Sequence, residues 1–467
     1  MHDSGAFFTQ NVPLLYVCYI EASHACLANI YYEGLSMKAY RGSLFHLIDD
    51  PSVVGIEAAH KYYEDGLLVV DGGHTVMAGD RALLEPSLAE GTEIIDHSGK
   101  LIVPGFIDTH IHFPQLDMIA SFGEQLLDWL EKYTFPEEAK FADPAHAKDC
   151  AEFFIAELLR NGTTTALVYG TVHKGSVDAL FTEAYKRGMR IVAGKALMDR
   201  NVPENVRDTP ESGDADSRAL IKEWHGKGRL GYAITPRFAP ACSDDQMARA
   251  GKLLAEHDDV LMHTHLSENG AEIDWVQKLY PTAKDYLDVY DKFGLLTERS
   301  VFAHCIHMES EEFQRMAEAD AAIAFCPTSN LFLGSGLFHL KEAEKYGIKV
   351  GLGTDVGAGT SVSLLQTMNE AYKVCHLRGG QLSPYKSFYL ATLGGAKALN
   401  MADKVGNFEA GKEADFLVLD MAATPLLERR TANCKTLDET LFVLTMLGDD
   451  RTVSHTYIAG ELQHTRG

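Results

Sequence analysis

Positive charge and long apolar runs are both scarce in this sequence. Its 42 lysines and arginines are outnumbered by 66 aspartates and glutamates, so the formal net charge is −24 at pH 7. Nucleic acids are bound through basic surfaces, and the chain has no block rich in lysine and arginine, so we expect no nucleic-acid partner. No apolar stretch approaches the ~20 residues that a transmembrane helix needs, so we expect no membrane partner. The acidic excess is typical of a protein kept in solution by its charge.

Paired cysteines are also missing. Eight cysteines are scattered through 467 residues, and none belongs to a C-x-x-C pair. This pattern predicts reduced, mostly buried thiols and a cytoplasmic protein. The apolar segment 12–20 lacks the preceding basic residues and the following cleavage site of a signal peptide. Because Met37 begins a more ordinary sequence, we interpret residues 1–36 as an N-terminal extension or as the result of a misassigned start.

Short apolar segments alternate with helical patterns between Gly105 and Asn400. Such alternation predicts a parallel sheet, and eight repeats of it predict an α/β fold of the (β/α)8 TIM-like barrel type. We assign residues 104–400 to this barrel. The expected strands are residues 102–112, 163–170, 190–199, 230–240, 260–268, 300–308, 321–330 and 349–359.

The two flanks of the barrel have a different pattern. Residues 37–103 and 401–467 contain short β-like pieces and turns, such as 66–70 and 411–419. We predict that the two ends pair into one small composite β-sandwich domain beside the barrel. Within the barrel, residues 199–217 are polar and contain proline, which predicts a long loop that shapes or covers the site.

Reactive side chains fall where the predicted strands end. In barrels of this type the active site is built at the carboxyl ends of the strands. Surface residues scattered at random would not follow this register, so the sequence predicts an enzyme. The side chains in question are His110, His112, Arg237, His265, Glu268, His304, Asn330 and Asp355.

Two histidines at the end of the first predicted strand favour a metal site. His110 and His112 are two residues apart, so on a strand they point to the same face. Two imidazoles on one face suit a Zn²⁺ site that keeps an open position. Downstream, His265 adds a third imidazole and Glu268 a carboxylate three residues later. A metal ion beside a proton-carrying glutamate is the minimal set for hydrolysis.

Six motifs spread over the whole predicted barrel carry a family resemblance. They are P-G-F-I-D-T-H-I-H (104–112), T-P-R-F-A-P (235–240), H-T-H-L-S-E-N (263–269), F-A-H-C-I-H (302–307), F-C-P-T-S-N (325–330) and G-T-D-V-G-A-G (353–359). With them the chain resembles the deaminases of the amidohydrolase superfamily, and more closely the guanine deaminases. G-K-E-A-D-F (411–416) matches the family's return into the β-sandwich. The resemblance implies hydrolytic deamination of guanine to xanthine and ammonia by a homodimer.

The resemblance also implies the metal centre. One ion per subunit, Zn²⁺, would be bound by His110, His112, His265 and Asp355, a donor set that also accepts Fe²⁺. The ion would lower the pKa of a bound water from about 15.7 toward 7. Glu268 would take the proton of this water and pass it to a ring nitrogen. A glutamate held partly out of water has a raised pKa, which suits this relay.

Further roles in catalysis and substrate binding follow from the resemblance. His304 would hydrogen-bond the attacking water or the developing intermediate, and Asp355 would help to deprotonate the water. Gln115, Arg237 and Phe238, together with His304, would bind the substrate. An amide that both donates and accepts, a fixed guanidinium and an aromatic face suit a flat purine that carries a carbonyl oxygen.

Other interpretations stay open. A relative that acts on a pterin, a cytosine, a triazine or adenine would use the same centre, because the centre only makes hydroxide. A non-catalytic scaffold would be expected to have lost ligands that are all present here. Residues 230–240 contain no lysine that could bridge two metals, so one metal is favoured, and Lys195 has no assigned role. His263 is expected to line the site or to support a ligand, and His307 to be structural.

Overall fold

Eight parallel strands form a ring at the centre of the structure, a computed structural model that describes residues 37–466. Strand β13 returns to β5, where the Thr109 hydroxyl donates to the Leu352 carbonyl at 2.9 Å. This ring confirms the predicted TIM-like barrel. In hydrogen-bonded order its strands are β5 (Phe106–His112), β6 (Thr163–Tyr169), β7 (Arg190–Gly194), β9 (Gly231–Pro236), β10 (Leu261–Leu266), β11 (Ser300–His304), β12 (Ala322–Phe325) and β13 (Lys349–Leu352), and the short β8 (Ala196–Leu197) pairs with β9.

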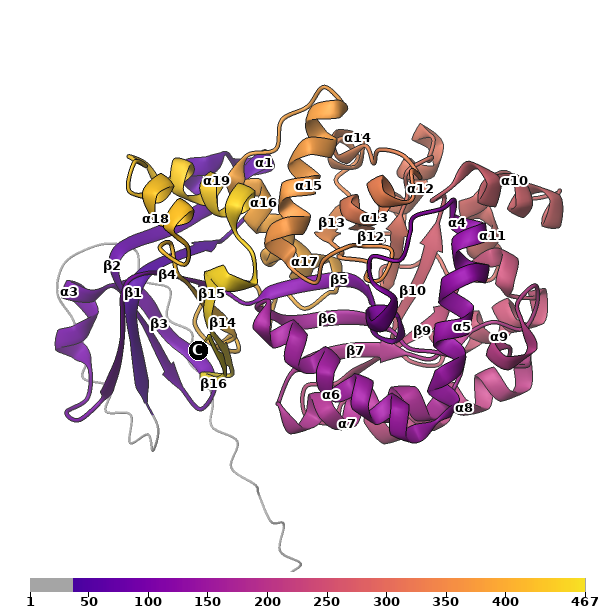
Figure 1. Ribbon diagram of the computed structural model, residues 1–467, viewed down its shortest axis with the longest axis horizontal. Coiled ribbons are helices and arrows are strands. Elements are labelled where there is room, and N and C mark those ends of the chain that lie inside the picture. The colour runs from indigo at the N-terminus through magenta and orange to yellow at the C-terminus, as the bar shows by residue number, and fades with distance from the viewer. Residues whose placement is uncertain (1–36, 467) are drawn as a thin grey trace, which may run out of the picture. The chain divides into compact units, whose positions relative to one another are not determined.

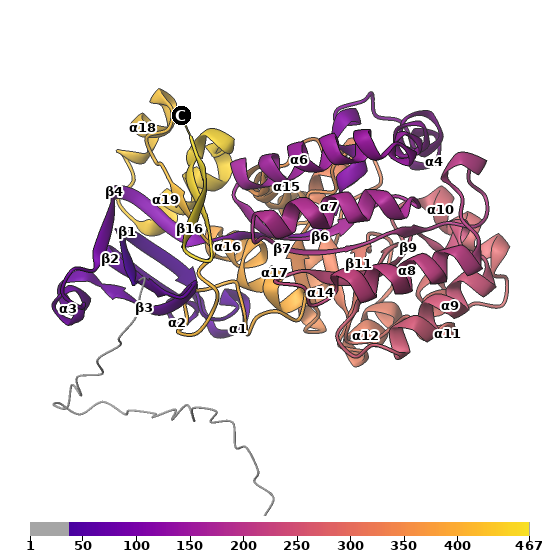
Figure 2. The same ribbon diagram turned by 90° about the horizontal axis from the view of Figure 1, so that it is seen from below.

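Helices follow the strands and lie outside them (Figures 1 and 2). The main ones are α6 (Pro144–Arg160), α7 (Lys174–Lys186), α8 (Pro210–Trp224), α9 (Asp244–Ala255), α10 (Gly270–Leu279), α11 (Tyr286–Lys292), α12 (Ser310–Glu318), α14 (Leu340–Lys345), α15 (Leu364–Leu377), α16 (Pro384–Ala391) and α17 (Leu393–Ala398). Between β5 and α6 the chain forms η2 (Phe113–Met118), α4 (Leu126–Trp129), η3 (Leu130–Thr134), α5 (Phe135–Glu138) and η4 (Ala139–Ala142). These short turns place several side chains over the strand ends.

The strands are buried on both faces, and they end earlier than the apolar runs suggested. Every residue of β6 is buried, as expected for a parallel strand covered by helices. Residues 321–330, predicted as one strand, divide into β12 and the helix α13 (Pro327–Phe332). Pro327 occupies the first turn of that helix, where its missing N–H costs nothing and its fixed φ is already helical.

The predicted long loop 199–217 is also shorter than expected, because α8 begins at Pro210. Thr209 caps this helix and Ser212 completes a capping box, which satisfies the free N–H groups of the first turn. The remaining loop is held at its end by a buried ion pair, in which the Lys195 Nζ lies 2.6 Å from Asp208. Lys195 therefore anchors the loop.

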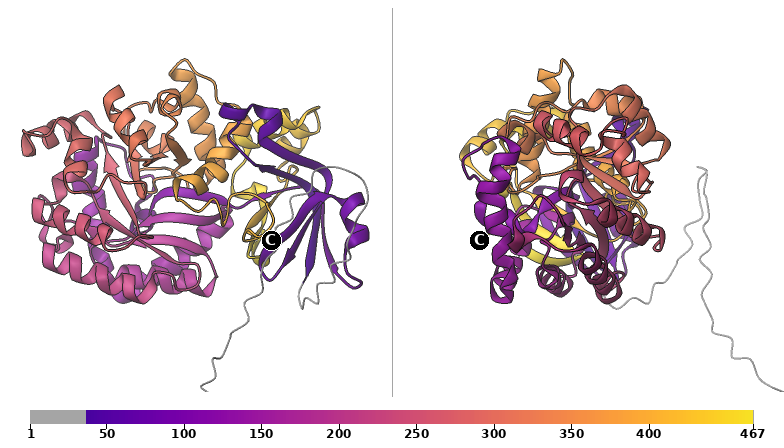
Figure 3. Two further views of the ribbon diagram at one scale, coloured as in Figure 1. Left: turned by 180° about the vertical axis from the view of Figure 1, so that it is seen from behind. Right: turned by 90° about the vertical axis from the view of Figure 1, so that its right-hand side faces the viewer.

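Strands from both ends of the chain form a second, seven-stranded sheet, and Figure 3 shows these two ends side by side. Its order is β16 (Glu461–Thr465), β15 (Val453–Ile458), β14 (Phe416–Leu419), β4 (Glu93–Pro104), β1 (Lys38–Leu47), β2 (His60–Asp71) and β3 (His74–Asp80). The sheet curls over its own core, because Tyr40 of β1 lies 5.1 Å from Tyr457 of β15 between ring centroids. Adjacent strands are about 4.8 Å apart, so a flat sheet would hold these rings much farther apart. The predicted β-domain built from both flanks is confirmed.

The first predicted strand, residues 102–112, belongs to two sheets. Residues up to Pro104 end β4, and β5 starts at Phe106. A side chain on the intervening Gly105 would lie 2.0 Å from the Thr164 hydroxyl, so only glycine fits at this crossing. The connecting helices of the flanks are α1 (Pro51–Val54), α2 (Ile56–Ala59), α3 (Arg81–Leu84), η1 (Glu85–Ser87), α18 (Pro425–Thr431), α19 (Leu437–Leu447) and η7 (Asp450–Thr452), and α19 packs on α15 and α16. The barrel loops also contain η5 (Glu204–Val206) and η6 (Ala239–Ala241).

A buried ionic network joins the second sheet to the barrel. Arg229 donates to Glu413 at 2.9 Å and to Asp415 at 3.0 Å, and Arg190 donates to the same Glu413 at 2.9 Å. Both acids belong to the segment 411–416 that resembles the family's return into the sandwich. The Asp415 carbonyl also accepts from the Gly105 amide at 2.9 Å. This segment therefore holds the barrel start and the second sheet together.

Residues 1–36, interpreted as an extension, lie outside the described part of the chain. The described cysteines, Cys150, Cys242, Cys305, Cys326, Cys375 and Cys434, are free thiols. Among the helices in residues 37–466, none combines the length and the apolar character required to cross a bilayer.

The ionic network predicts a large loss of stability when one partner is removed. We expect Arg229→Ala to lower the free energy of unfolding by about 3–5 kcal/mol, because it leaves the buried Asp415 carboxylate without a counter-charge and Glu413 with Arg190 alone. The matched control is Arg218→Ala: the Arg218 side chain is 37% exposed, against 15% for Arg229. Its loss should be below ~1 kcal/mol. Urea unfolding followed by fluorescence measures both, and equal losses would contradict the role given to the network.

Candidate active site

Three imidazoles and one carboxylate converge on one point at the carboxyl ends of β5, β10 and β13. The Nε2 atom of His112 lies 3.3 Å from the Nε2 atoms of His110 and His265. An Asp355 oxygen lies 3.1 Å from His110 and 3.3 Å from His112. A tetrahedral ion with bonds of about 2.0–2.1 Å has edges of about 3.3 Å between its ligand atoms. The spacing therefore fits one small divalent metal ion.

The charge states of these groups also fit a cation. Burial lowers the pKa of His110 and lowers that of His112 to about 3, so both rings are neutral at pH 7. Burial lowers the pKa of His265 well below its usual range as well. Burial alone would raise the pKa of Asp355, but the adjacent histidines outweigh it and keep the carboxylate ionised. Neutral nitrogen lone pairs that face each other at 3.3 Å repel unless a cation lies between them.

Hydrogen bonds fix the orientation of two of these rings. The His265 Nδ1 atom lies 2.6 Å from the Arg237 carbonyl, which leaves Nε2 free to bind a metal. The His110 Nδ1 atom lies 2.6 Å from Nε2 of His263. His263 is fully buried and holds the His110 ring in place, which is consistent with one of its two predicted roles. Asp108 accepts from the Thr354 hydroxyl at 2.5 Å and so ties β5 to the turn that carries Asp355.

The backbone is strained at three of the strand ends that form this site. Ser267, His304 and Asp355 have φ values of 51°, 71° and 51°, in the left-handed region that residues other than glycine rarely adopt. Such strain persists only where the surroundings impose it, and it concentrates at functional sites. A side chain on Gly359 would meet the Thr354 carbonyl oxygen at 1.7 Å, so glycine is required to close the turn around Asp355.

Glu268 lies beside the convergent ligands in a water-poor environment. Burial, followed by the nearby charge of Asp355, raises its pKa from 4.5 to about 8. The Ser335 hydroxyl donates to one of its oxygens at 3.3 Å, and the Nε2 atom of His304 lies 3.5 Å from the other. The opposite ring nitrogen of His304 is 2.8 Å from the Asn330 side-chain oxygen. Glu268 is therefore held in place and can exchange a proton near neutral pH.

A buried glutamate that the sequence analysis missed anchors the two polar side chains expected to bind substrate. Glu138 is fully buried and accepts from the Arg237 guanidinium at 2.8 Å through both of its oxygens. It also accepts from the Gln115 amide at 3.0 Å, while the Gln115 carbonyl oxygen accepts from the Gly357 amide at 3.2 Å. Nothing in the local sequence around Glu138 indicates this contact, because it depends on how the turns after β5 fold back over the barrel.

One cavity is lined by most of the polar groups described above, namely His112, Gln115, Arg237, His265, Glu268, His304 and Asp355. Phe238, which follows Arg237, is in its wall, and the Phe238 ring packs edge-on against Trp275 with centroids 6.2 Å apart. The apolar part of the wall was not predicted, because it comes from the turns after β5 and from loops at the ends of β12 and β13. It consists of Leu126, Trp129, Leu130, Leu333 and Ala358. Flat apolar side chains with a few convergent polar groups are typical of a small-molecule site.

Two residues of the sequence analysis lie away from this cavity wall. The His307 ring nitrogen is 2.8 Å from the Ser335 carbonyl, so His307 supports the segment that holds Glu268. Lys195 forms the buried ion pair with Asp208 that holds the loop before α8.

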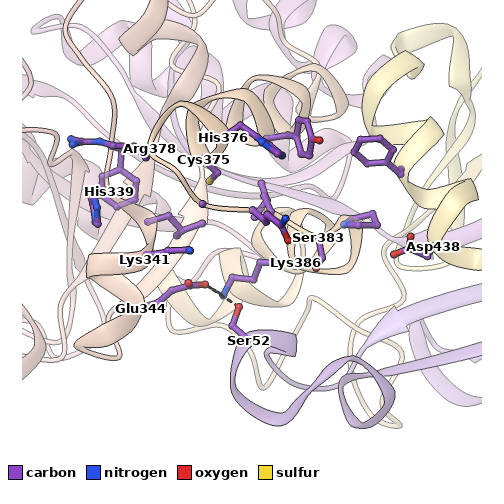
Figure 4. Close-up of a pocket in the computed structure, with 18 residues that line it drawn as sticks. Ser52, His339, Lys341, Glu344, Cys375, His376, Arg378, Ser383, Lys386 and Asp438 are labelled. Atoms are coloured by element: carbon purple, nitrogen blue, oxygen red, sulfur yellow. Dashed lines mark hydrogen bonds and ion pairs between the residues drawn. The ribbon is translucent and has the colours of Figure 1, made fainter.

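Figure 4 shows a different cavity, between α14, the α15–α16 connection and α19. Its Lys386 lies 2.7 Å from Asp50 and 2.8 Å from Glu344, and Ser52 donates to Glu344 at 3.0 Å. These groups pair with one another across the N-terminal segment and the barrel helices. We therefore assign this cavity to the joint between those parts rather than to catalysis.

The barrel, the ligand cluster and the adjacent glutamate define a metal-dependent hydrolase, and comparison with known proteins gives its family. The profile of the amidohydrolase family matches residues 101–462, so the chain belongs to the amidohydrolase family. The resemblance to guanine deaminases is confirmed as well. The chain is 52% identical over 434 residues to the guanine deaminase of Escherichia coli K12. The aligned region covers 92% of this chain and 98% of that one.

Solved structures of guanine deaminases have the same fold as this chain. The structure of the E. coli guanine deaminase superimposes with a TM-score of 0.90, over 92% of this chain and all of that one. The guanine deaminase of C. acetobutylicum, whose structure has guanine bound in the active site, is 32% identical with a TM-score of 0.82, over 91% of this chain and all of that one.

The cluster of three histidines and Asp355 predicts that the protein binds a metal ion that can be measured. We expect His265→Ala to lose one equivalent of bound divalent metal per chain, because three of four donors do not complete the site. His376 is exposed and lies on α15, so His376→Ala is the matched control and should keep the full metal content. Elemental analysis after gel filtration measures both. An unchanged metal content in His265→Ala would show that the ion lies elsewhere.

Proposed function

We propose that this chain hydrolyses guanine to xanthine and ammonia. The observation that carries the proposal is one cavity in which a metal-ligand set, a buried glutamate with a pKa of about 8 and the Gln115–Arg237 pair come together. The similarity to guanine deaminases over nearly the whole chain supports the same substrate.

His110, His112, His265 and Asp355 would hold the ion, which when bound supplies hydroxide at neutral pH. Glu268 accepts the proton of the attacking water and delivers it to the ring nitrogen beside the carbon that bears the amino group. The new C–O bond forms as that nitrogen is protonated. The remaining proton of the added hydroxyl then moves to the amino group, the C–N bond breaks, and ammonia leaves as the C–O bond becomes the carbonyl of xanthine. His304 lies 3.5 Å from Glu268 and 3.7 Å from Asp355, where it can hold the attacking oxygen between them.

Substrate choice belongs to the other side of the cavity. The Arg237 guanidinium donates to the carbonyl oxygen of guanine, which adenine lacks, and the Gln115 amide donates or accepts at the ring edge. Phe238 and the apolar wall take up the flat faces of the ring. A buried site built to pair with such groups can reject an analogue that lacks them by about 10⁴–10⁵.

The metal and the assembly are part of the same proposal. Neutral imidazoles with one carboxylate suit Zn²⁺, and they also accept Fe²⁺. From the family resemblance we expect one such ion per subunit at this centre and a homodimer. The free cysteines fit a reducing compartment, so we place the enzyme in the cytoplasm, where it would act in purine catabolism.

The direct test is ammonia release from guanine by metal-replete protein, measured beside adenine, cytosine and a pterin. Turnover of guanine alone supports both the chemistry and the substrate assignment. Turnover of a different ring would keep the mechanism and overturn the substrate. No turnover by fully metallated protein would refute the proposal.

In the same assay, we expect Glu268→Gln to lower kcat by about 10²–10⁴, because an amide cannot carry the proton. The substitution keeps the shape of the side chain, so metal content should stay unchanged. Full activity in this variant would rule out the role given to Glu268.

The anchor at Glu138 predicts a selective effect on substrate binding. We expect Glu138→Gln to raise KM for guanine at least about tenfold with a smaller change in kcat, because Arg237 loses its buried counter-charge and one of the two acceptor oxygens is replaced by a donor. Glu131 is exposed, so Glu131→Gln is the matched control and should leave both constants unchanged. A KM equal to that of the wild type would show that Arg237 and Gln115 do not depend on Glu138.

A further inference from the structure

A second group of metal-type ligands lies outside the active-site cavity. Asp117 belongs to η2, Glu137 to α5, and His146 and Cys150 to α6. His146 and Cys150 are four residues apart and therefore lie on the same face of their helix. The side chains of Asp117, His146 and Cys150 bring their donor atoms within 4.8 Å of one another, although they come from two separate segments.

The distances in this outer cluster match a site with one sulfur ligand. The Cys150 sulfur lies 3.5 Å from His146 Nε2 and 3.7 Å from an Asp117 oxygen. A tetrahedral zinc ion with a Zn–S bond of about 2.3 Å and a Zn–N bond of about 2.0 Å separates sulfur from its neighbours by about 3.5 Å. Glu137 Oε1 lies 4.0 Å from the same His146 nitrogen but outside the group of three mutually close donors, so it would have to move closer to act as a fourth ligand.

A buried carboxylate oxygen of Glu137 lacks a hydrogen-bond partner among the described residues, which indicates that the cluster binds a cation. Glu137 is only 8% exposed, and its Oε1 atom has no hydrogen-bond partner, whereas its other oxygen accepts from Lys140 at 2.6 Å. A buried carboxylate oxygen without a partner is costly, and a cation beside His146 would satisfy it. The Phe141 ring packs edge-on against His146 with centroids 4.7 Å apart, which holds the imidazole in place.

We propose that Asp117, Glu137, His146 and Cys150 form a second metal site that takes a zinc-type divalent ion. A thiolate with an imidazole and carboxylates favours borderline ions such as Zn²⁺ over Mg²⁺ or Ca²⁺. This site is separate from the catalytic centre, since none of its four ligands lines the active-site cavity.

The position of the outer site gives it a structural consequence. Asp117 is two residues after Gln115 on the same turn, and Glu137 directly precedes Glu138. An ion bound there ties both segments to α6 and so restrains the backbone that carries the Gln115–Glu138–Arg237 contacts.

The test uses the full chain loaded with Zn²⁺ alone and freed of loosely bound ions by gel filtration. We expect two equivalents of zinc per chain in the wild type, and one in both Cys150→Ser and His146→Ala. Cys434 is a half-buried free thiol that does not belong to the outer cluster. Cys434→Ser is therefore the matched control and should keep two equivalents of zinc. One equivalent in the wild type, or two in Cys150→Ser, overturns the proposal.

Substitution with Co²⁺ separates the two sites by spectrum, because only the outer site contains a sulfur ligand in this assignment. We expect a thiolate-to-cobalt charge-transfer band in the wild type and in His265→Ala, and its loss in Cys150→Ser. Circular dichroism checks that each variant is folded. A band that survives in Cys150→Ser, or that disappears in His265→Ala, contradicts the assignment.

Discussion

Three uncharged imidazoles and one carboxylate are forced onto a single point, and this constraint shapes the rest of the active site. His110 and Asp355 come from opposite ends of the barrel sequence, and only closure of β13 against β5 brings them together. The left-handed backbone at Asp355 and the glycine that follows it in the same turn serve this convergence. The facing ring nitrogens and the carboxylate would repel one another in an apolar core. We expect a cation between them, which would remove this repulsion.

Burial gives the neighbouring side chains different tasks. It raises the pKa of Glu268 toward neutrality, whereas the histidines hold the pKa of Asp355 low, so two carboxylates in one cavity differ in protonation. Glu138 is equally buried but is matched by Arg237, so it serves as a fixed acceptor. In the proposed mechanism, these different partners assign proton transfer to Glu268 and leave Glu138 to position Arg237 and Gln115.

The barrel and the clustering of His110, His112 and His265 could be predicted because both follow from local pattern, whereas Asp355 was assigned to the cluster by the family resemblance. Apolar runs marked the strands, and the histidines stood at their ends. The start of α8 at Pro210 was missed although Thr209, Pro210 and Ser212 form a recognisable capping sequence. Glu138 could not be found in this way, because its contacts cross from the turns after β5 to β9 and depend on tertiary packing. The division of residues 102–112 between two sheets likewise follows from a crossing at Gly105 that periodicity does not record.

The second sheet combines strands from both ends of the sequence, and this has a consequence for biosynthesis. Strand β4 pairs on one side with β1 and on the other with β14, and Phe416 is made only after every residue of the barrel has been synthesised. During synthesis the edge of β4 around Ile102 and Val103 thus lacks its native neighbour, and an open apolar edge is prone to wrong pairing. Completion of the fold is delayed until the last strands arrive, which makes the C-terminal segment, remote from the chemistry, decisive for the yield of active enzyme.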